Sequence, residues 1–213
     1  MRKNSWLLVV SVVALMRSFE AIGGVYEDIL VAARDDRADV VMDLLSRGMD
    51  PNTSDPAGTT LLMFAAGNGN EQLLEFLLRS RANMLKQNRY GDTAVALAAL
   101  NGHLPIARRL VAAGADIANT GWNALHYAAF NGHVEIVRFL VSKKTDLNIR
   151  APNGNTALML AARNGHKEVV SMLVEAGADL DLDDREGNTA FSMAIKAGNT
   201  EIADQLRGNG AGK

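Results

Sequence analysis

Pairs of adjacent alanines recur along this chain at nearly constant spacing, and this regularity limits the possible folds more than any other feature. The pairs are Ala32-Ala33, Ala65-Ala66, Ala98-Ala99, Ala128-Ala129 and Ala161-Ala162, followed by Ala194-Ile195. The intervals between them are 33, 33, 30, 33 and 33 residues. A fixed period in this range indicates a solenoid, in which similar units stack and each unit contacts only its neighbours.

Each unit repeats one order of features: a glycine, a small polar residue two positions later, an apolar helix with the alanine pair, a turn, and a second helix ending near Gly-Ala-Asp. The clearest copy is GNTALMLAARNGHKEVVSMLVEAGADLDL, residues 154–182. This order resembles the ankyrin repeat over residues 26 to about 210. The family's usual Thr-Pro-Leu-His is represented by TLLM, TAVA, NALH, TALM and TAFS, so its proline is replaced throughout, mostly by alanine.

The resemblance implies an all-α solenoid of about six helix–turn–helix units, with β-hairpin or turn fingers between them. We expect one ankyrin-repeat domain over residues 24–213. Its units are predicted at residues 25–55, 56–88, 89–119, 120–150, 151–183 and 184–210. The end units depart from the pattern, because Asp36 replaces the inter-helix glycine of the first and Ile195 breaks the alanine pair of the last.

Caps and turns support the same units. Threonines stand where each first helix should begin, and a capping side chain there contributes about 1 kcal/mol. They are Thr60, Thr93, Thr156 and Thr189. Glycines stand in the turns, where only glycine adopts a positive φ without strain. They are Gly69, Gly102, Gly132, Gly165 and Gly198 between the helices, and Gly48, Gly114 and Gly177 after the second helix. Arg81 and Lys144 replace this last glycine in two units, so we expect strained or rearranged turns there.

The composition argues against several classes of function. The 22 basic and 24 acidic residues give a formal net charge of −2 without a long run of like charge, so nucleic acid is not an expected partner. The absence of cysteine excludes disulfides, thiol nucleophiles and Cys-ligated zinc. No serine lies in a Gly-x-Ser-x-Gly motif, and no glycines form a phosphate-binding loop. We therefore expect neither enzymatic activity nor a cofactor.

The repeated polar residues are expected to be structural. His103, His133 and His166 hold equivalent positions in stacked units, about 10 Å apart and too far to share a metal ion. We predict that these histidines and His126 bond to backbone. The acidic and amide residues that follow each second helix are predicted to close turns. They are Asp50, Asn83, Asp116, Asp146 and Asp179. Met63 and Met159, which stand where His126 does, are expected to fill the core.

The first 23 residues have the pattern of a secretory signal peptide. Arg2 and Lys3 precede an apolar run over residues 6–16, and the small residues Ala21 and Gly23 precede the expected cleavage site. The run is shorter than the 20 or so residues that span a bilayer. An uncleaved anchor or a misassigned start codon is the alternative. Cleavage after Gly23 removes three basic and one acidic residue, which leaves 19 basic and 23 acidic residues and a charge of −4. We expect a periplasmic or secreted chain, with no membrane insertion after cleavage.

One finger is short. Four residues separate Asp116 from Gly121, whereas seven separate the corresponding residues of the other fingers. Trp122 follows this short finger, at the position of Thr59, Asp92, Asn155 and Asn188. Phe130 stands at the end of a first helix, which in the ankyrin fold faces the concave groove, and Tyr90 belongs to the neighbouring tip. These aromatics form either an exposed recognition patch or, for Trp122, a plug for the gap.

The resemblance favours a non-catalytic binding scaffold, because ankyrin repeats present finger tips and first-helix faces to another protein. The candidate partner-binding residues are Arg89, Tyr90, Asp92, Leu100, Trp122, Phe130, Asn153, Asn155, Arg163 and Glu186. Together with the N-terminal segment, the chain resembles exported ankyrin-repeat proteins of the bacterial periplasm. We expect a monomer that acts as accessory to an exported enzyme or envelope protein. An exported effector that binds a host protein is the alternative, and a hydrolase built on the solenoid is a third, less favoured reading.

Overall fold

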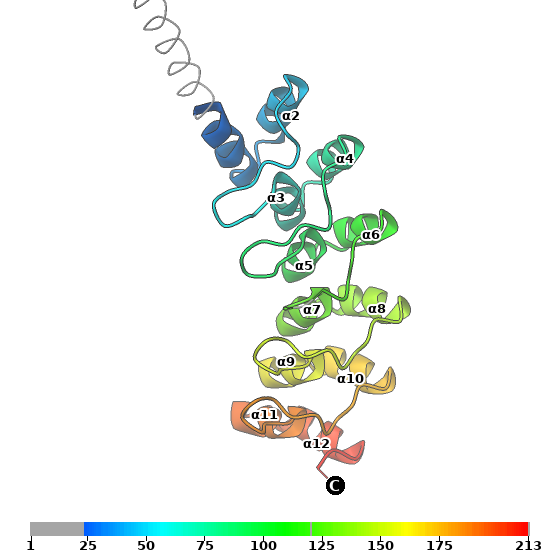
Figure 1. Cartoon of the computed structure of the whole chain (residues 1–213). Helices are drawn as coiled ribbons and strands as arrows, with labels where there is room; N and C mark the ends of the chain where they lie inside the picture. Colours follow the sequence, from blue (N-terminus) through cyan, green and yellow to red (C-terminus); the bar gives the residue numbers. More distant parts are fainter. Residues whose placement is uncertain (1–23, 120, 213) are drawn as a thin grey trace, which may run out of the picture.

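A computed structural model describes residues 24–119 and 121–212, which form a stack of antiparallel helix pairs (Figure 1). The predicted signal peptide, residues 1–23, lies outside the described residues. A helical segment over residues 24–34 precedes α2 (Ala38–Ser46). The following pairs are α3 (Leu61–Asn68) with α4 (Glu71–Arg79), α5 (Ala94–Leu100) with α6 (Leu104–Ala112), α7 (Ala124–Asn131) with α8 (Val134–Ser142), α9 (Ala157–Asn164) with α10 (Lys167–Glu175), and α11 (Ala190–Ala197) with α12 (Thr200–Gly208).

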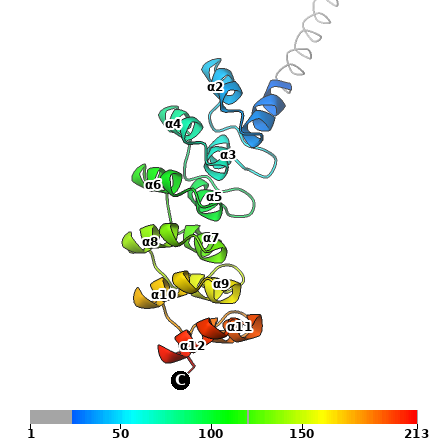
Figure 2. The same cartoon turned by 180° about the vertical axis from the view of Figure 1, so that it is seen from behind.

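The first helices and the second helices form two columns. Figures 1 and 2, seen from opposite sides, both show α3, α5, α7, α9 and α11 in one column and α4, α6, α8 and α10 in the other. From α3 to α11, each first helix packs on the first helix of the next unit. This arrangement confirms the ankyrin-type helical stack, while the count of six units and their boundaries stay predictions. Among the described residues, no helix has the length and apolar character that crossing a membrane requires.

Alanine pairs line the contacts between successive first helices. Ala128, Ala129, Ala161 and Ala162 are each 0% exposed. Their small side chains let neighbouring helices approach closely, while the larger residues of the second helices fill the space behind them. Those residues include Leu73, Leu77, Ile106, Leu110, Ile136, Leu140, Val170 and Leu173.

Helices α3, α5, α9 and α11 begin at the predicted threonine caps. The Thr60 hydroxyl accepts the N–H of Met63 at 3.2 Å, and Thr93, Thr156 and Thr189 make the equivalent bond. In α7 the cap is Asn123, whose Oδ1 accepts the N–H of His126 at 3.0 Å. These bonds satisfy N–H groups that the first turn of a helix leaves without a partner.

The turns after the second helices keep glycine-like geometry even where glycine is absent. Arg81 and Lys144 have φ values of 61° and 57°, in the left-handed region. Asp36, at the inter-helix position of the first unit, has φ 58°. Of the two predicted outcomes, strain and rearrangement, the structure therefore shows strain. The helix stack fixes the path of the chain, so these side chains accept a conformation that costs roughly 1–2 kcal/mol.

The repeated histidines and carboxylates have the predicted structural roles. Nε2 of His103 lies 3.0 Å from the carbonyl oxygen of Gly67 in the preceding unit, and His133 and His166 repeat this contact. Oδ1 of Asp50 accepts the N–H of Asn52 at 2.8 Å, and Asn83, Asp116, Asp146 and Asp179 close the same turn in their units. These side chains stabilise backbone turns rather than line a reactive site.

Candidate protein-interaction surface

Fingers project from the stack between one unit's second helix and the next unit's first helix. The expected hairpins are present as turns: the described residues contain isolated bridges, Ser54 with Thr60 and Asp183 with Thr189, and no strand. Neighbouring full-length fingers pack on each other. The N–H of Arg89 donates to the carbonyl of Ala57 at 2.8 Å, which joins the finger of residues 83–92 to the one before it.

The row of fingers is interrupted at residues 116–122. Figure 1 shows projecting loops before α3, α5, α9 and α11, and none of that size before α7. On the near side of this gap, Tyr90 at the tip of residues 83–92 is 70% exposed. On the far side, the finger of residues 146–155 packs on its successor so closely that a Cβ on Gly154 would lie 2.8 Å from the backbone nitrogen of Arg185. The three missing residues thus separate two packed pairs of fingers.

Trp122 sits at the gap and packs on the first helix of its own unit. Its ring centroid lies 5.1 Å from that of Tyr127, 5.6 Å from that of Phe130 in an edge-on arrangement, and 6.2 Å from that of His126. Trp122, Tyr127 and Phe130 are all half-buried. We call these three residues the aromatic cluster. Tyr90 makes none of these ring contacts, so it lies apart from the cluster that it was expected to join. Trp122 therefore covers α7, and its ring also remains partly open to solvent.

Asp92 and Tyr127 connect the cluster to the preceding finger. The Tyr127 hydroxyl donates to Oδ1 of Asp92 at 2.6 Å, and Nδ2 of Asn88 donates to Oδ2 at 3.0 Å. Burial raises the pKa of Tyr127, and the hydrogen bond to the Asp92 carboxylate raises it further. Asp92 is 7% exposed, so both oxygens of this predicted binding residue are engaged within the chain.

His126 lies below the cluster and is buried. Its Nδ1 accepts the N–H of Asn123 at 3.3 Å, and its Nε2 lies 3.0 Å from the carbonyl oxygen of Ile149 in the next finger. Both ring nitrogens are thus used when Nε2 carries the proton. Burial lowers the pKa of His126, although the backbone hydrogen bonds at Ile149 and Asn155 oppose the shift. A neutral imidazole here ties α7 to the finger of residues 146–155.

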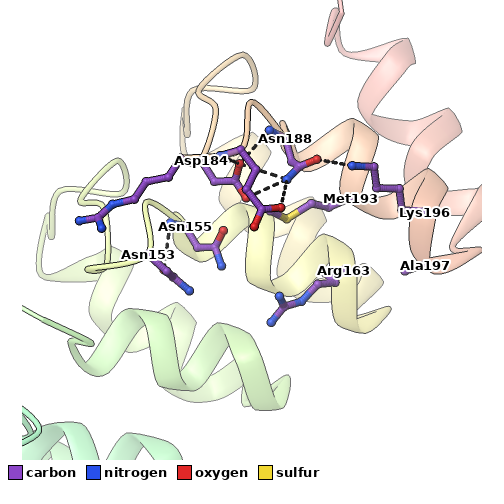
Figure 3. A pocket seen from close by; sticks show the side chains of 10 residues that line it. Asn153, Asn155, Arg163, Asp184, Asn188, Met193, Lys196 and Ala197 are labelled. Atoms are coloured by element: carbon purple, nitrogen blue, oxygen red, sulfur yellow. Dashed lines mark hydrogen bonds between the residues drawn. The ribbon is translucent and has the colours of Figure 1, made fainter.

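A second feature is a polar hollow near the C-terminal end, with a cavity volume of about 640 Å³. It lies between the fingers of residues 146–155 and 179–188 and the helices α9 and α11 (Figure 3). It brings together four of the predicted residues, Asn153, Asn155, Arg163 and Glu186. The sequence interpretation did not assign binding roles to the other lining residues, Asp184, Arg185, Asn188, Met193, Lys196 and Ala197. Asn188 and Met193 hold the positions of Trp122 and Tyr127, and this alignment is the signal that could have identified them.

One wall of the hollow is a closed hydrogen-bond network. Nδ2 of Asn188 donates to both carboxylate oxygens of Asp184, at 3.1 and 3.0 Å, and to Oε2 of Glu186 at 3.3 Å. The ammonium of Lys196 donates to Oδ1 of Asn188. Burial opposes ionisation of Asp184, but hydrogen bonds from Asn188 and Glu186 and the charge of Lys196 outweigh it and lower the pKa of this carboxyl. The two acids of the hollow are therefore directed into its own wall.

The remaining predicted residues lie apart from both features. The guanidinium of Arg89 donates a hydrogen bond to the carbonyl of Pro56 at 2.6 Å. This bond holds the Arg89 side chain along the preceding finger. Leu100, at the end of α5, is half-buried, and its carbonyl accepts bonds from Asn131 and His133 of the next unit. The ten candidates thus divide among the finger of residues 83–92, the end of α5, the aromatic cluster and the polar hollow, rather than forming one continuous patch.

A comparison with protein-family models agrees with the architecture. A family described as ankyrin repeats (3 copies) matches three overlapping stretches, residues 29–120, 81–151 and 143–213. Ankyrin repeats are generally protein–protein interaction modules, and proteins of this kind are typically non-catalytic scaffolds. The stacked helix pairs, the capped first helices and this match over most of the sequence establish that the chain belongs to the ankyrin-repeat family.

Proposed function

We propose that the chain is a non-catalytic protein–protein interaction scaffold of the bacterial envelope, accessory to an exported enzyme or another envelope protein. The observation that carries this proposal is the interrupted row of fingers. It leaves Trp122 and Phe130 half-exposed beside a finger whose tip carries the exposed Tyr90. Clusters of aromatic side chains contribute much of the binding energy at many protein interfaces. A partner segment that covers the short finger would contact this aromatic cluster.

The proposed location rests on the sequence of residues 1–23, with its basic start, short apolar run and small residues before Gly24. An intact-mass measurement on protein purified from the cell envelope tests it. We expect a chain that begins near Gly24. Recovery of the complete 213-residue chain from the cytoplasm would contradict export.

The binding role is tested by capturing envelope proteins on the immobilised chain that begins at Gly24. The double variant Trp122→Ala with Phe130→Ala should weaken binding of a captured protein by about 2 kcal/mol or more, because it removes the exposed rings. Leu85→Ala is the matched control, since Leu85 is an exposed apolar residue, 60% accessible, outside the candidate set. Equal capture by the double variant and the wild type would argue against the aromatic cluster as the binding surface.

A further inference from the structure

The side chain of Asn155 is buried in the wall of the polar hollow without a hydrogen-bond partner. Asn155 is 3% exposed. Among the described residues its enclosed Oδ1 accepts no hydrogen bond, and no acceptor lies within hydrogen-bond distance of its Nδ2. Its backbone is engaged: the N–H donates to Oδ1 of Asn153 at 3.2 Å, and the carbonyl accepts the N–H of Ala151 at 2.9 Å. A buried amide without partners costs about 1–3 kcal/mol. Such a group requires an explanation that packing alone does not give.

Equivalent residues in other units do have partners. The amide of Asn188 donates to Asp184, four residues earlier in its own finger, and the carboxylate of Asp92 accepts from Asn88 at the same spacing. In the finger of Asn155 this partner position is held by Ala151, which has no polar side chain.

The partner from the following unit is missing as well. Tyr127 reaches back from α7 to bond Asp92 of the preceding unit. The corresponding residue that follows Asn155 is Met193, whose side chain has no hydroxyl group. Two substitutions, Ala151 within the finger and Met193 in the next first helix, therefore leave the Asn155 amide unsatisfied at the wall of the hollow.

The charge beside this amide is positive. Arg163 lines the hollow at the end of α9 and is exposed, and its guanidinium forms no hydrogen bond or ion pair with residues 24–119 or 121–212. In Figure 3 the side chains of Asn153, Asn155 and Arg163 lie together, across from the network of Asp184, Asn188 and Lys196. Since that network already engages the acids Asp184 and Glu186, Arg163 is left available for an external anion.

We propose that the hollow binds a carboxylate of a partner protein, with the Arg163 guanidinium and the Asn155 amide as hydrogen-bond donors. A carboxylate is an acceptor-only group with two oxygens, which suits a planar guanidinium and an amide N–H₂ side by side. It would accept from Nδ2 of Asn155 as the Asp184 carboxylate accepts from Nδ2 of Asn188 in the next unit. The cavity of about 640 Å³ accommodates an acidic side chain or a chain terminus together with adjoining backbone. This inference rests on the proposed scaffold function and gives the partner's chemistry at a site separate from the aromatic cluster.

The test is a titration of the ¹⁵N-labelled chain from Gly24 onward with three short peptides, followed by NMR. The first peptide, acetyl-Gly-Glu-Asp-Glu-Gly-amide, carries side-chain carboxylates. The second replaces its acids with Gln and Asn, and the third is a neutral peptide with a free C-terminal carboxylate. We expect the side-chain amide signal of Asn155 to shift with the first or the third peptide and to stay unchanged with the second. The first and third peptides distinguish a side-chain carboxylate from a chain terminus.

Variants then identify the donors. Arg163→Ala should weaken binding about tenfold, because it removes a charge-assisted hydrogen bond. Arg79→Ala, which removes an exposed arginine on α4, should leave the affinity unchanged. Asn155→Leu should abolish the contact without lowering the thermal midpoint, since it removes an unsatisfied buried amide.

Three results would overturn the inference: equal binding of the uncharged peptide, equal loss with Arg79→Ala and Arg163→Ala, or no shift at Asn155 with either carboxylate. None of them affects the aromatic cluster. Protein capture that depends on Trp122 and Phe130 tests the scaffold function independently, so the two proposals can fail separately.

Discussion

The fingers before α7 and α11 start from equivalent positions and produce opposite surfaces. Before α7 the loop is three residues shorter, and Trp122 packs its ring on Tyr127 and Phe130. Before α11 the loop has full length, and Asn188 at the same position closes a polar network with Asp184 and Lys196. One region presents aromatic rings, whereas the other presents a charged hollow.

The helices beneath these two fingers are alike. Helices α7 and α11 each contain eight residues, begin at a side-chain cap and end at a glycine with positive φ. The comparison shows that the stack tolerates changes in finger length because the alanine contacts lie in the helices. Finger sequence is thus free to vary, and it is there that the surface chemistry differs between units.

The largest effect should follow from placing a charge in the helix stack. Ala162→Glu should lower the free energy of unfolding by about 3 kcal/mol or more, because the new carboxylate has no partner at a fully buried contact. The loss should extend to neighbouring units, since their stability is coupled. Urea unfolding measures both, with Ala112→Glu at an exposed helix position as the control. An unchanged midpoint for Ala162→Glu would mean that Ala162 does not lie at a buried contact between helices and that the repeat register is wrong.

A smaller effect is expected at the short finger. Trp122→Ala should lower the free energy of unfolding by about 2 kcal/mol, because it removes a half-buried ring that contacts three other rings. Tyr90→Ala, at a tip that is 70% exposed, should change stability by less than about 0.5 kcal/mol. Equal stability of the two variants would remove the plugging role from Trp122 and leave only recognition. The two roles are compatible, and the structure gives Trp122 the geometry for both.

The cap of α7, formed by Asn123 and His126, should make the free energy of unfolding depend on pH. Because burial lowers the pKa of His126, the unfolded chain binds a proton that the folded chain resists. This contribution is complete above pH 6.5, the ordinary value for histidine, and is lost as the pH falls below it, by up to about 1.4 kcal/mol per pH unit. Met159 holds the same place in α9, and its Sδ accepts the cap N–H of Thr156 at 3.4 Å.

His126→Met therefore supplies the matched variant. Chemical unfolding measures the free energy of unfolding of both proteins at pH 7.5 and pH 5.5. Between these two values the wild type should lose more stability than the variant. Parallel pH profiles for the two proteins would show that His126 does not titrate with unfolding.

The smallest effect concerns the strained turns. Lys144→Gly should raise stability by about 0.5–1 kcal/mol, because glycine adopts a φ of 57° without the clash of a Cβ. Lys143→Gly is the control, since Lys143 has an ordinary φ of −85° and glycine there should be destabilising. Stabilisation by both substitutions, or by neither, would show that the positive φ of Lys144 does not reduce stability.

Much of the fold follows from the sequence. Thr156 caps α9 and Gly165 ends it, as the repeat pattern predicts, because caps and turns depend on residues a few positions apart. The burial of Ala161 and Ala162 follows from the same period. The candidate surface was predicted less completely. Asn155 and Arg163 were selected, but neither their shared hollow nor the Asp184–Asn188–Lys196 network was foreseen.

The sequence by itself determined the repeat, the helices and their caps, since these depend on local spacing and on a period that recurs in every unit. Only the tertiary structure decided that Asp92 is engaged by Tyr127 while Asn155 is left without a partner. The physical reason is the distance along the chain: Tyr127 lies 35 residues after Asp92, and such a contact exists only once two units have stacked. The specific chemistry of this protein's surface arises from those contacts between units rather than from any one repeat.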